Sequence, residues 1–220
     1  MNRAGTMVPN LFGKETSFSL RPALFPPVPG IALNGNQARK LDFAQKRLAE
    51  LVAFVRDSPE TQYFIPMIQL REAILSSRIE DIECSIDEVL KAEAGKMRGR
   101  EVCLVQGLRE AAEYALSRRK ELLLCNRLVR EAHRVLFGTV CETGKNPGEF
   151  SKTQNWIGPA GCTLATASHV PPPNVQDMLE GLANLENYIN YRDGSDPLIR
   201  AALVHYQFET IKAAHHIVPS

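Results

Sequence analysis

Residues 127–136 read Arg-Leu-Val-Arg-Glu-Ala-His-Arg-Val-Leu, and this stretch has the periodicity of an amphipathic helix. Its apolar members are Leu128, Ala132, Val135 and Leu136. They recur at three and four residues, which places them on one helical face. Asn126 precedes the stretch and is a favoured N-cap residue, and Gly138 can end the helix. We therefore predict a helix here, with an apolar face that needs a partner.

The same periodicity extends along the chain on both sides of this stretch. We predict further helices over residues 37–56, 66–80, 102–116, 174–191 and 197–211. Ser85-Ile-Asp-Glu88 is a capping box that opens a short helix, which Gly95 can close. The stretch 66–80 has apolar residues on two sides, with Ile68, Leu75 and Ile79 on the second. The fold class indicated is all-α.

Two segments do not follow the helical pattern. Residues 1–30 are proline-rich, and proline fixes φ and removes a backbone donor, so we predict an extended arm. Residues 138–174 are rich in Gly, Thr, Ser and Pro, and a small β-hairpin is predicted only there. With a polar break near residue 98, these features divide the chain into the arm, a helical domain at 31–97 and a second domain at 98–220.

Composition and charge exclude several classes of protein. The formal net charge is +1, which gives no electrostatic footprint for nucleic acid or anionic membranes. No stretch approaches the roughly 20 apolar residues that cross a bilayer. The five cysteines form no Cys-x-x-Cys pair, so they predict reduced thiols rather than a disulfide framework or a zinc site. These observations favour a cytoplasmic protein.

A search for catalytic motifs finds no phosphate-binding glycine loop, no zinc-protease motif and no nucleophile elbow. His133 and His205 lie within predicted helices, where a hydrogen-bonded interior or interfacial histidine is the commoner case. The pair His215-His216 has no carboxylate or cysteine at ligand spacing, so we predict no metal site.

Two segments have patterns that can be either structural or functional. Ser76 and Glu80 are one helical turn apart, as in an exposed polar pair on a helix or in a functional pair. Gln154, Asn155, Trp156, Ile157 and Gly158 form a polar and aromatic loop around the single tryptophan, which can also be simple loop packing. Spacing alone leaves both alternatives open.

Taken together and in order, these segments resemble the Fic family. Ser76 to Glu80 resembles the motif of its inhibitory helix, in which Gly or Asn follows the glutamate where this chain has Asp81. Residues 127–136, Pro147-Gly-Glu-Phe150, Gln154 to Gly158 and Val170-Pro-Pro-Pro173 resemble the core and its flap. His205-Tyr-Gln-Phe-Glu-Thr-Ile211 resembles the helix that leads into the signature His-Pro-Phe-x-Asp/Glu-Gly-Asn-Gly-Arg.

The resemblance implies a Fic-like helical bundle with a small β-hairpin flap. It implies transfer of AMP from ATP, with Mg²⁺, to a hydroxyl side chain of a target protein. Ser76 and Glu80 would be regulatory residues, and Gln154, Asn155, Trp156, Ile157 and Gly158 would dock the target. In the family, the signature histidine is the general base and the signature turn binds the phosphates.

This sequence departs from the family after Ile211, where Lys212 stands in place of the histidine and no glycine follows Gly194. We therefore expect an incomplete core without catalytic residues, with no productive binding of ATP or Mg²⁺. The abrupt change is typical of a reading-frame shift near codon 212. It predicts that Leu128, Ala132 and Val135 lack cover, which favours poor solubility or a homo-oligomer. The alternative is a non-catalytic module that binds a partner, such as an intact Fic protein, through the Ser76–Glu80 helix and the Trp156 flap.

Overall fold

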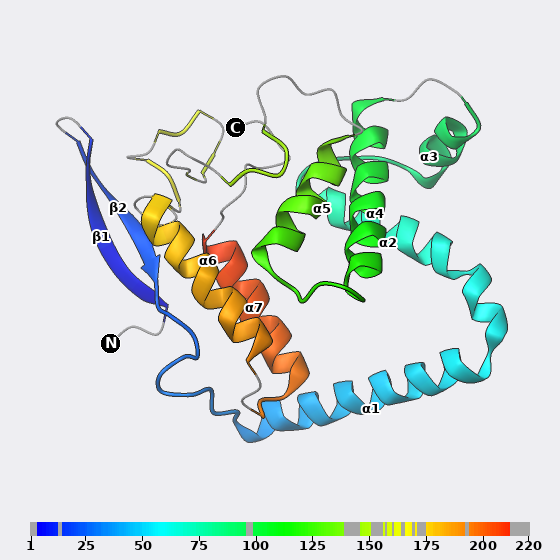
Figure 1. The fold of residues 1–220 in the computed structure, drawn as a ribbon, viewed down its shortest axis with the longest axis horizontal. Helices are drawn as coiled ribbons and strands as arrows, with labels where there is room; N and C mark the ends of the chain where they lie inside the picture. Colours follow the sequence, from blue (N-terminus) through cyan, green and yellow to red (C-terminus); the bar gives the residue numbers. More distant parts are fainter. Residues whose placement is uncertain are drawn as a thin grey trace.

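The computed structural model describes residues 4–12, 15–95, 99–138, 146–150, 156, 158–159, 161–163, 166–168, 170, 175–191 and 194–211. These residues form seven α-helices, one 3-10 helix and one two-stranded antiparallel sheet (Figure 1). The prediction of an all-α protein with a small β-hairpin is confirmed. Within the described part, no helix combines the length and apolar character needed to cross a membrane.

The β-hairpin lies in the N-terminal segment, so its predicted position was wrong. Strands β1 (Gly5–Phe12) and β2 (Glu15–Pro22) pair antiparallel, with Gly5 opposite Pro22. The described residues between 139 and 174 include no strand. The sequence places Gly13-Lys14 between the two strands, and a two-residue Gly-x connection is a recognised hairpin signal. The prolines of this segment masked that signal.

After β2 the chain continues as an arm that is held against helices α6 (Val175–Asn190) and α7 (Pro197–Ile211). The side-chain amide of Asn184 accepts from the Phe25 N–H at 2.7 Å and donates to the Phe25 carbonyl at 3.0 Å. Gln207 donates to the carbonyl of Ala23 at 2.9 Å. The Phe25 ring packs edge-on against Tyr188. The arm therefore completes the apolar core between α6 and α7.

A second core forms where helices α2 (Ile65–Ile79), α3 (Ile86–Glu93) and α4 (Arg100–Arg118) meet. Its buried members are Leu70, Ala73, Ile74, Cys84, Val89, Ala92, Val102 and Val105. The predicted capping box is present, since Ser85 accepts from the Glu88 N–H and Glu88 accepts from the Ser85 N–H. This core contains residues from both sides of the domain boundary that we predicted near residue 98.

The third core lies between α4 and α5 (Asn126–Gly138), which run side by side in Figure 1. Leu128 is only 2% exposed, and Ala132 and Val135 pack against this core. The expectation that these three residues lack cover was therefore wrong, because α4 covers the apolar face of α5. Next to this core, hydrogen bonds from Arg127 and Tyr114 hold the pKa of Glu131 below its ordinary value.

Helices α5 and α6 are joined at the beginning of α5. The Asn126 N–H donates to the Glu186 carboxylate at 2.8 Å, and the Asn126 side chain donates to the Leu182 carbonyl at 3.2 Å. A carboxylate at a helix N-terminus is favourable because the free N–H groups there carry partial positive charge. The predicted role of Asn126 as a side-chain cap is thus replaced by a carboxylate from another helix.

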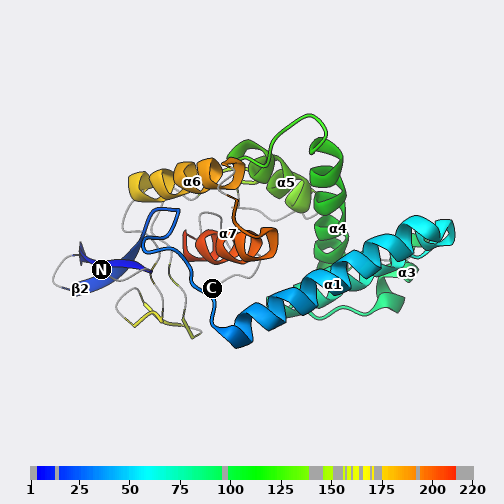
Figure 2. The same ribbon diagram turned by 90° about the horizontal axis from the view of Figure 1, so that it is seen from below.

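Helix α1 (Gly35–Asp57) differs from the others because none of its residues is buried. It begins at Asn34, which forms a capping box with Gln37. At the middle of α1, Gln45 donates to Asp196, which caps α7. The 3-10 helix η1 (Pro59–Tyr63) then leads into α2. Figures 1 and 2 show α1 running along one side of the molecule between the beginning of α7 and α2.

Candidate functional site

Ser76 and Glu80 lie at the C-terminal end of α2, as the sequence predicted. Glu80 is the C-cap residue and is partly buried, and its N–H donates to the Ser77 carbonyl at 3.0 Å. The neighbouring Ser77 is buried, and its hydroxyl lies 2.9 Å from the Ile74 carbonyl and 3.3 Å from the Ile82 carbonyl. Of the two adjacent serines, Ser77 therefore fixes the turn that presents Glu80, and spacing alone did not distinguish them.

Asp81 has a positive φ of 56°, the only such value among the described residues other than glycine. This left-handed conformation costs L-residues about 1–2 kcal/mol, and Gly, Asn and Asp tolerate it best. The turn explains physically why the motif that Ser76–Glu80 resembles ends with Gly or Asn. Asp81 is an acceptable but strained replacement at that position.

The segment Pro147–Phe150, at the start of the predicted flap, is held by α5. Arg130 donates to the Gly148 carbonyl at 2.7 Å and forms an ion pair with Glu149 at 2.7 Å. His133 is half-buried and accepts from the Gly148 N–H through Nδ1 at 2.8 Å, as expected of a hydrogen-bonded interior or interfacial histidine. We call residues 147–150 the flap base. These contacts hold the flap base on helix α5, and sequence periodicity did not assign this role to Arg130.

Gly148 allows this close approach. It has φ of +82°, and a Cβ there would lie 2.9 Å from the Arg130 carbonyl and 2.9 Å from the Arg134 guanidinium. Any larger residue would push the flap base away from α5. The glycine is therefore a structural part of the candidate site.

Two of the predicted flap residues, Trp156 and Gly158, are described. The Trp156 indole donates to the Cys162 carbonyl at 3.3 Å, and the ring remains 39% exposed. A Cβ on Gly158 would lie 2.7 Å from the Cys162 sulfur, so this glycine also permits a close contact. Gln154, Asn155 and Ile157 lie outside the described residues.

The last described turn of α7 is firmly placed. Ile211 and Gln207 are each 1% exposed, and Ile211 packs where a Cβ on Gly181 would lie 3.1 Å from its Cδ1. His205 lies on the exposed side of α7, so it is not an interior histidine. Lys212, His215 and His216 lie outside the described residues. The chain direction is thus fixed up to the residue before Lys212.

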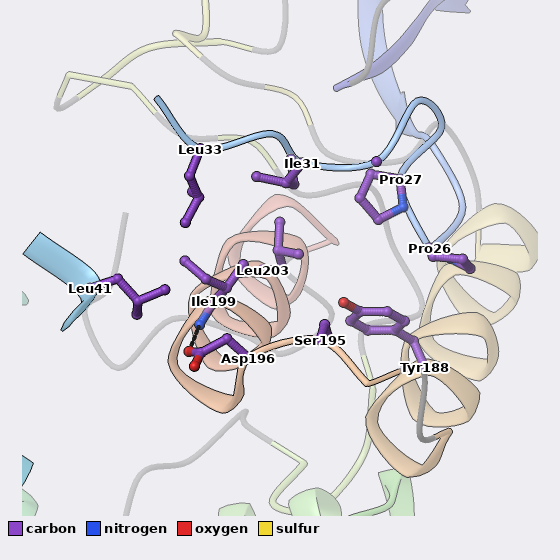
Figure 3. Close-up of a pocket in the computed structure, with 11 residues that line it drawn as sticks. Pro26, Pro27, Ile31, Leu33, Leu41, Tyr188, Ser195, Asp196, Ile199 and Leu203 are labelled. Atoms are coloured by element: carbon purple, nitrogen blue, oxygen red, sulfur yellow. Dashed lines mark hydrogen bonds between the residues drawn. The ribbon is translucent and has the colours of Figure 1, made fainter. Parts of the chain in front are cut away.

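A half-open apolar cavity of about 310 Å³ lies at the beginning of α7 (Figure 3). It is lined by Pro26, Pro27, Gly30, Ile31, Leu33, Leu41, Tyr188, Ser195, Asp196, Ile199 and Leu203. Its one carboxylate, Asp196, already accepts from the Leu198 and Ile199 N–H groups. The cavity contains none of the residues that the sequence predicted as a site.

In the described part of the chain, no three His, Cys, Asp or Glu side chains cluster as metal ligands. The segment 212–220 contains neither an acidic residue nor a glycine, whereas Mg²⁺ prefers carboxylate oxygens. Among the thiols, burial and the nearby Glu88 and Glu101 raise the pKa of Cys84, which makes it a poor nucleophile.

Comparison with known families gives two matches that together cover most of the chain. Residues 38–117 match the family model described as Fic/DOC family N-terminal. Residues 123–213 match the model described as Fic/DOC family. No curated protein matches the chain.

We predict that Asp81→Gly stabilises the fold, because glycine adopts φ of 56° without the steric cost paid by aspartate. The free energy of unfolding in urea should rise by about 0.5–1 kcal/mol, and Asp81→Val should lower it by about 1–2 kcal/mol. The matched control is Glu83→Gly at an exposed site nearby, which should give no gain. An equal gain in the two glycine variants would contradict the strain at Asp81.

Replacement of Gly148 should separate the cost of close packing from the cost of a positive φ. Gly95 also has a positive φ, but a Cβ there has open space around it. Gly95→Ala should therefore cost only about 1 kcal/mol, and Gly148→Ala should cost a further 1–3 kcal/mol or so for steric overlap. Denaturant unfolding measures both values. Equal losses would show that the flap base is not packed against α5.

Proposed function

This chain belongs to the Fic/DOC family, and on that premise we propose that the 220-residue polypeptide does not itself transfer AMP from ATP to a protein hydroxyl. The observation that carries the proposal is the sequence Ile211-Lys-Ala-Ala-His-His, which stands where the family signature would begin. The described end of α7 supports it, because Gln207 and Ile211 are buried and hold the helix in place up to the residue before Lys212. The position after Ile211 is thus occupied by a lysine.

Lys212 is unsuited to general-base chemistry. A lysine ammonium has an ordinary pKa of about 10.4, so at neutral pH it has no lone pair to accept a hydroxyl proton. His215 and His216 are three and four residues further on, and a base displaced by this much does not meet the same attacking oxygen. The proton-accepting step of the family reaction therefore has no group at its expected place.

The means to hold the phosphates are missing from the same segment. An anion nest needs successive backbone N–H groups in a tight turn, usually with glycine, and residues 212–220 contain no glycine. Residues 212–220, which stand where the signature would lie, include no carboxylate to hold Mg²⁺. Loss of such charge stabilisation typically costs several kcal/mol in the transition state. Two independent requirements of the reaction are therefore unmet.

The purified chain incubated with α-labelled ATP and Mg²⁺ should place no label on itself or on added protein, above a blank without the chain. Lys212→His should remain inactive as well, because a restored base still lacks the phosphate turn. An active Fic-family enzyme assayed in parallel is the positive control. Label that depends on the chain, and is lost in His215→Ala or His216→Ala, would overturn the proposal.

A second candidate function is regulation of an intact Fic protein through Glu80. The observation that favours it is the exposure of the tip of α2, where Ile79 is 83% exposed next to Glu80. The Ser77 hydrogen bonds and the Asp81 turn hold this tip in one conformation. A preorganised tip loses little entropy when it binds. In this role, the exposed Trp156 would contact the same partner or its target.

The test is titration of this chain into an active Fic-family enzyme whose AMP transfer is measured. The wild-type chain should inhibit, and Glu80→Ala should weaken inhibition about tenfold, or by about 1.4 kcal/mol. Glu83→Ala is the matched control, because Glu83 is an exposed glutamate three residues away. No inhibition by the wild-type chain, or equal weakening by both variants, would eliminate this candidate.

A further inference from the structure

Helix α1, the 3-10 helix η1 and the first turn of α2 expose many large apolar side chains. Ten large apolar residues between positions 48 and 68 are 43–75% exposed. They are Leu48, Leu51, Val52, Phe54, Val55, Tyr63, Phe64, Ile65, Met67 and Ile68, and together we name them the corner face. Exposed apolar side chains in this number within one short segment are typical of an interaction surface.

The amount of surface is what a stable interface requires. Full burial of a large apolar side chain removes roughly 60–120 Å² from water, so ten half-exposed ones offer on the order of 300–600 Å². A standard interface buries about 800 Å² on each partner, of which roughly 56–65% is apolar. The corner face therefore supplies the apolar part of one standard interface.

Within α1 the apolar residues follow a spacing typical of helix pairing. Leu41, Ala44, Leu48, Leu51 and Val55 recur alternately at three and four residues, which forms a straight seam along a helix. The small Ala44 lets a second helix approach closely. A long helix with such a seam fits another helix better than it fits an extended segment.

The charges along α1 indicate which helix would pair with it. Residues 35–47 contain Arg39, Lys40, Lys46 and Arg47 against the single acid Asp42. Residues 48–60 contain Glu50, Asp57 and Glu60 against the single base Arg56. An antiparallel copy places the basic half of one helix beside the acidic half of the other, whereas a parallel copy places like charges together. The helix is therefore complementary to itself in the antiparallel direction.

The antiparallel order also brings exposed aromatic residues of one copy close to the apolar cavity of the other. With the pairing centred between Leu48 and Leu51, Tyr63 and Phe64 of one copy lie near the beginning of the other copy's α1. The half-open apolar cavity lined by Leu33, Leu41 and Ile199 opens at that same end of α1 (Figure 3). Aromatic anchors and apolar pockets are the usual centre of an interface.

From these observations we propose that the protein forms a twofold dimer in which α1 packs antiparallel against α1 of a second copy and the two corner faces are buried. The interface is isologous, so each contact occurs twice. This inference goes beyond the proposed function and does not depend on the absence of AMP transfer.

Light scattering during size-exclusion chromatography of the full chain should give a dimer, twice the 24.5 kDa of one copy. Leu51→Glu should raise the dissociation constant about 100-fold or more, because the symmetric seam would bury two unpaired carboxylates. Leu116→Glu, at a similarly exposed leucine on α4, should leave the dimer intact.

Zero-length cross-linking of a mixture of ¹⁴N and ¹⁵N chains tests the orientation without any substitution. Mixed-isotope links should join Lys40 or Lys46 to Asp57 or Glu60. Within one chain these pairs are about 16 Å or more apart along the helix axis, too far for such a link. This measurement also decides the matter if Leu51→Glu fails to fold.

A monomeric wild-type chain, assemblies larger than a dimer, or a dimer without mixed-isotope links would each overturn the proposal. A dimer that Leu51→Glu leaves unchanged, or that Leu116→Glu disrupts equally, would do the same.

Discussion

Helix α4 buries side chains on two of its faces, and the helical part of the fold depends on this arrangement. Val102 and Val105 pack into the core shared with α2 and α3, while Leu104 and Ala111 pack into the core shared with α5. Leu108 borders both cores. Because apolar burial is the main favourable term in folding, the central helix determines where its neighbours lie. Both elements of the candidate site, the end of α2 and the flap base on α5, therefore rest on α4.

A separate core forms around the N-terminal arm. Phe25 lies between α6 and α7, and its backbone is bound by the amide of Asn184. Gln207 holds the arm again near the end of α7. A buried peptide group without a partner is costly, so these two amide side chains allow an irregular segment to lie inside a helical core. This arrangement fixes Ile211, the residue at which the resemblance to the family signature ends.

The contrast between these cores and α1 shows how apolar patterns acquire their roles. Helix α5 and helix α1 have similar stripes in the sequence, yet Leu128 of α5 is buried and Leu51 of α1 is 57% exposed. Periodicity predicts that a helix has an apolar face, but it does not indicate which neighbour covers that face. The loss of the family signature after Ile211 led us to expect an uncovered surface on α5, whereas the structure has exposed apolar residues on α1 and at the start of α2.

The sequence by itself determined the helices, their approximate ends, the capping box at Ser85, and the motif positions Ser76, Glu80 and Trp156. These follow from local backbone propensities and from the order of motifs along the chain. Only the tertiary structure decided that Ser77 and Asp81 shape the turn beside Glu80, and that Arg130 and Gly148 anchor the flap. It also decided that the N-terminal segment forms a hairpin, with Pro9 and Pro22 inside its strands. Those features arise from contacts between residues distant in sequence, or from single φ values, which leave no periodic pattern.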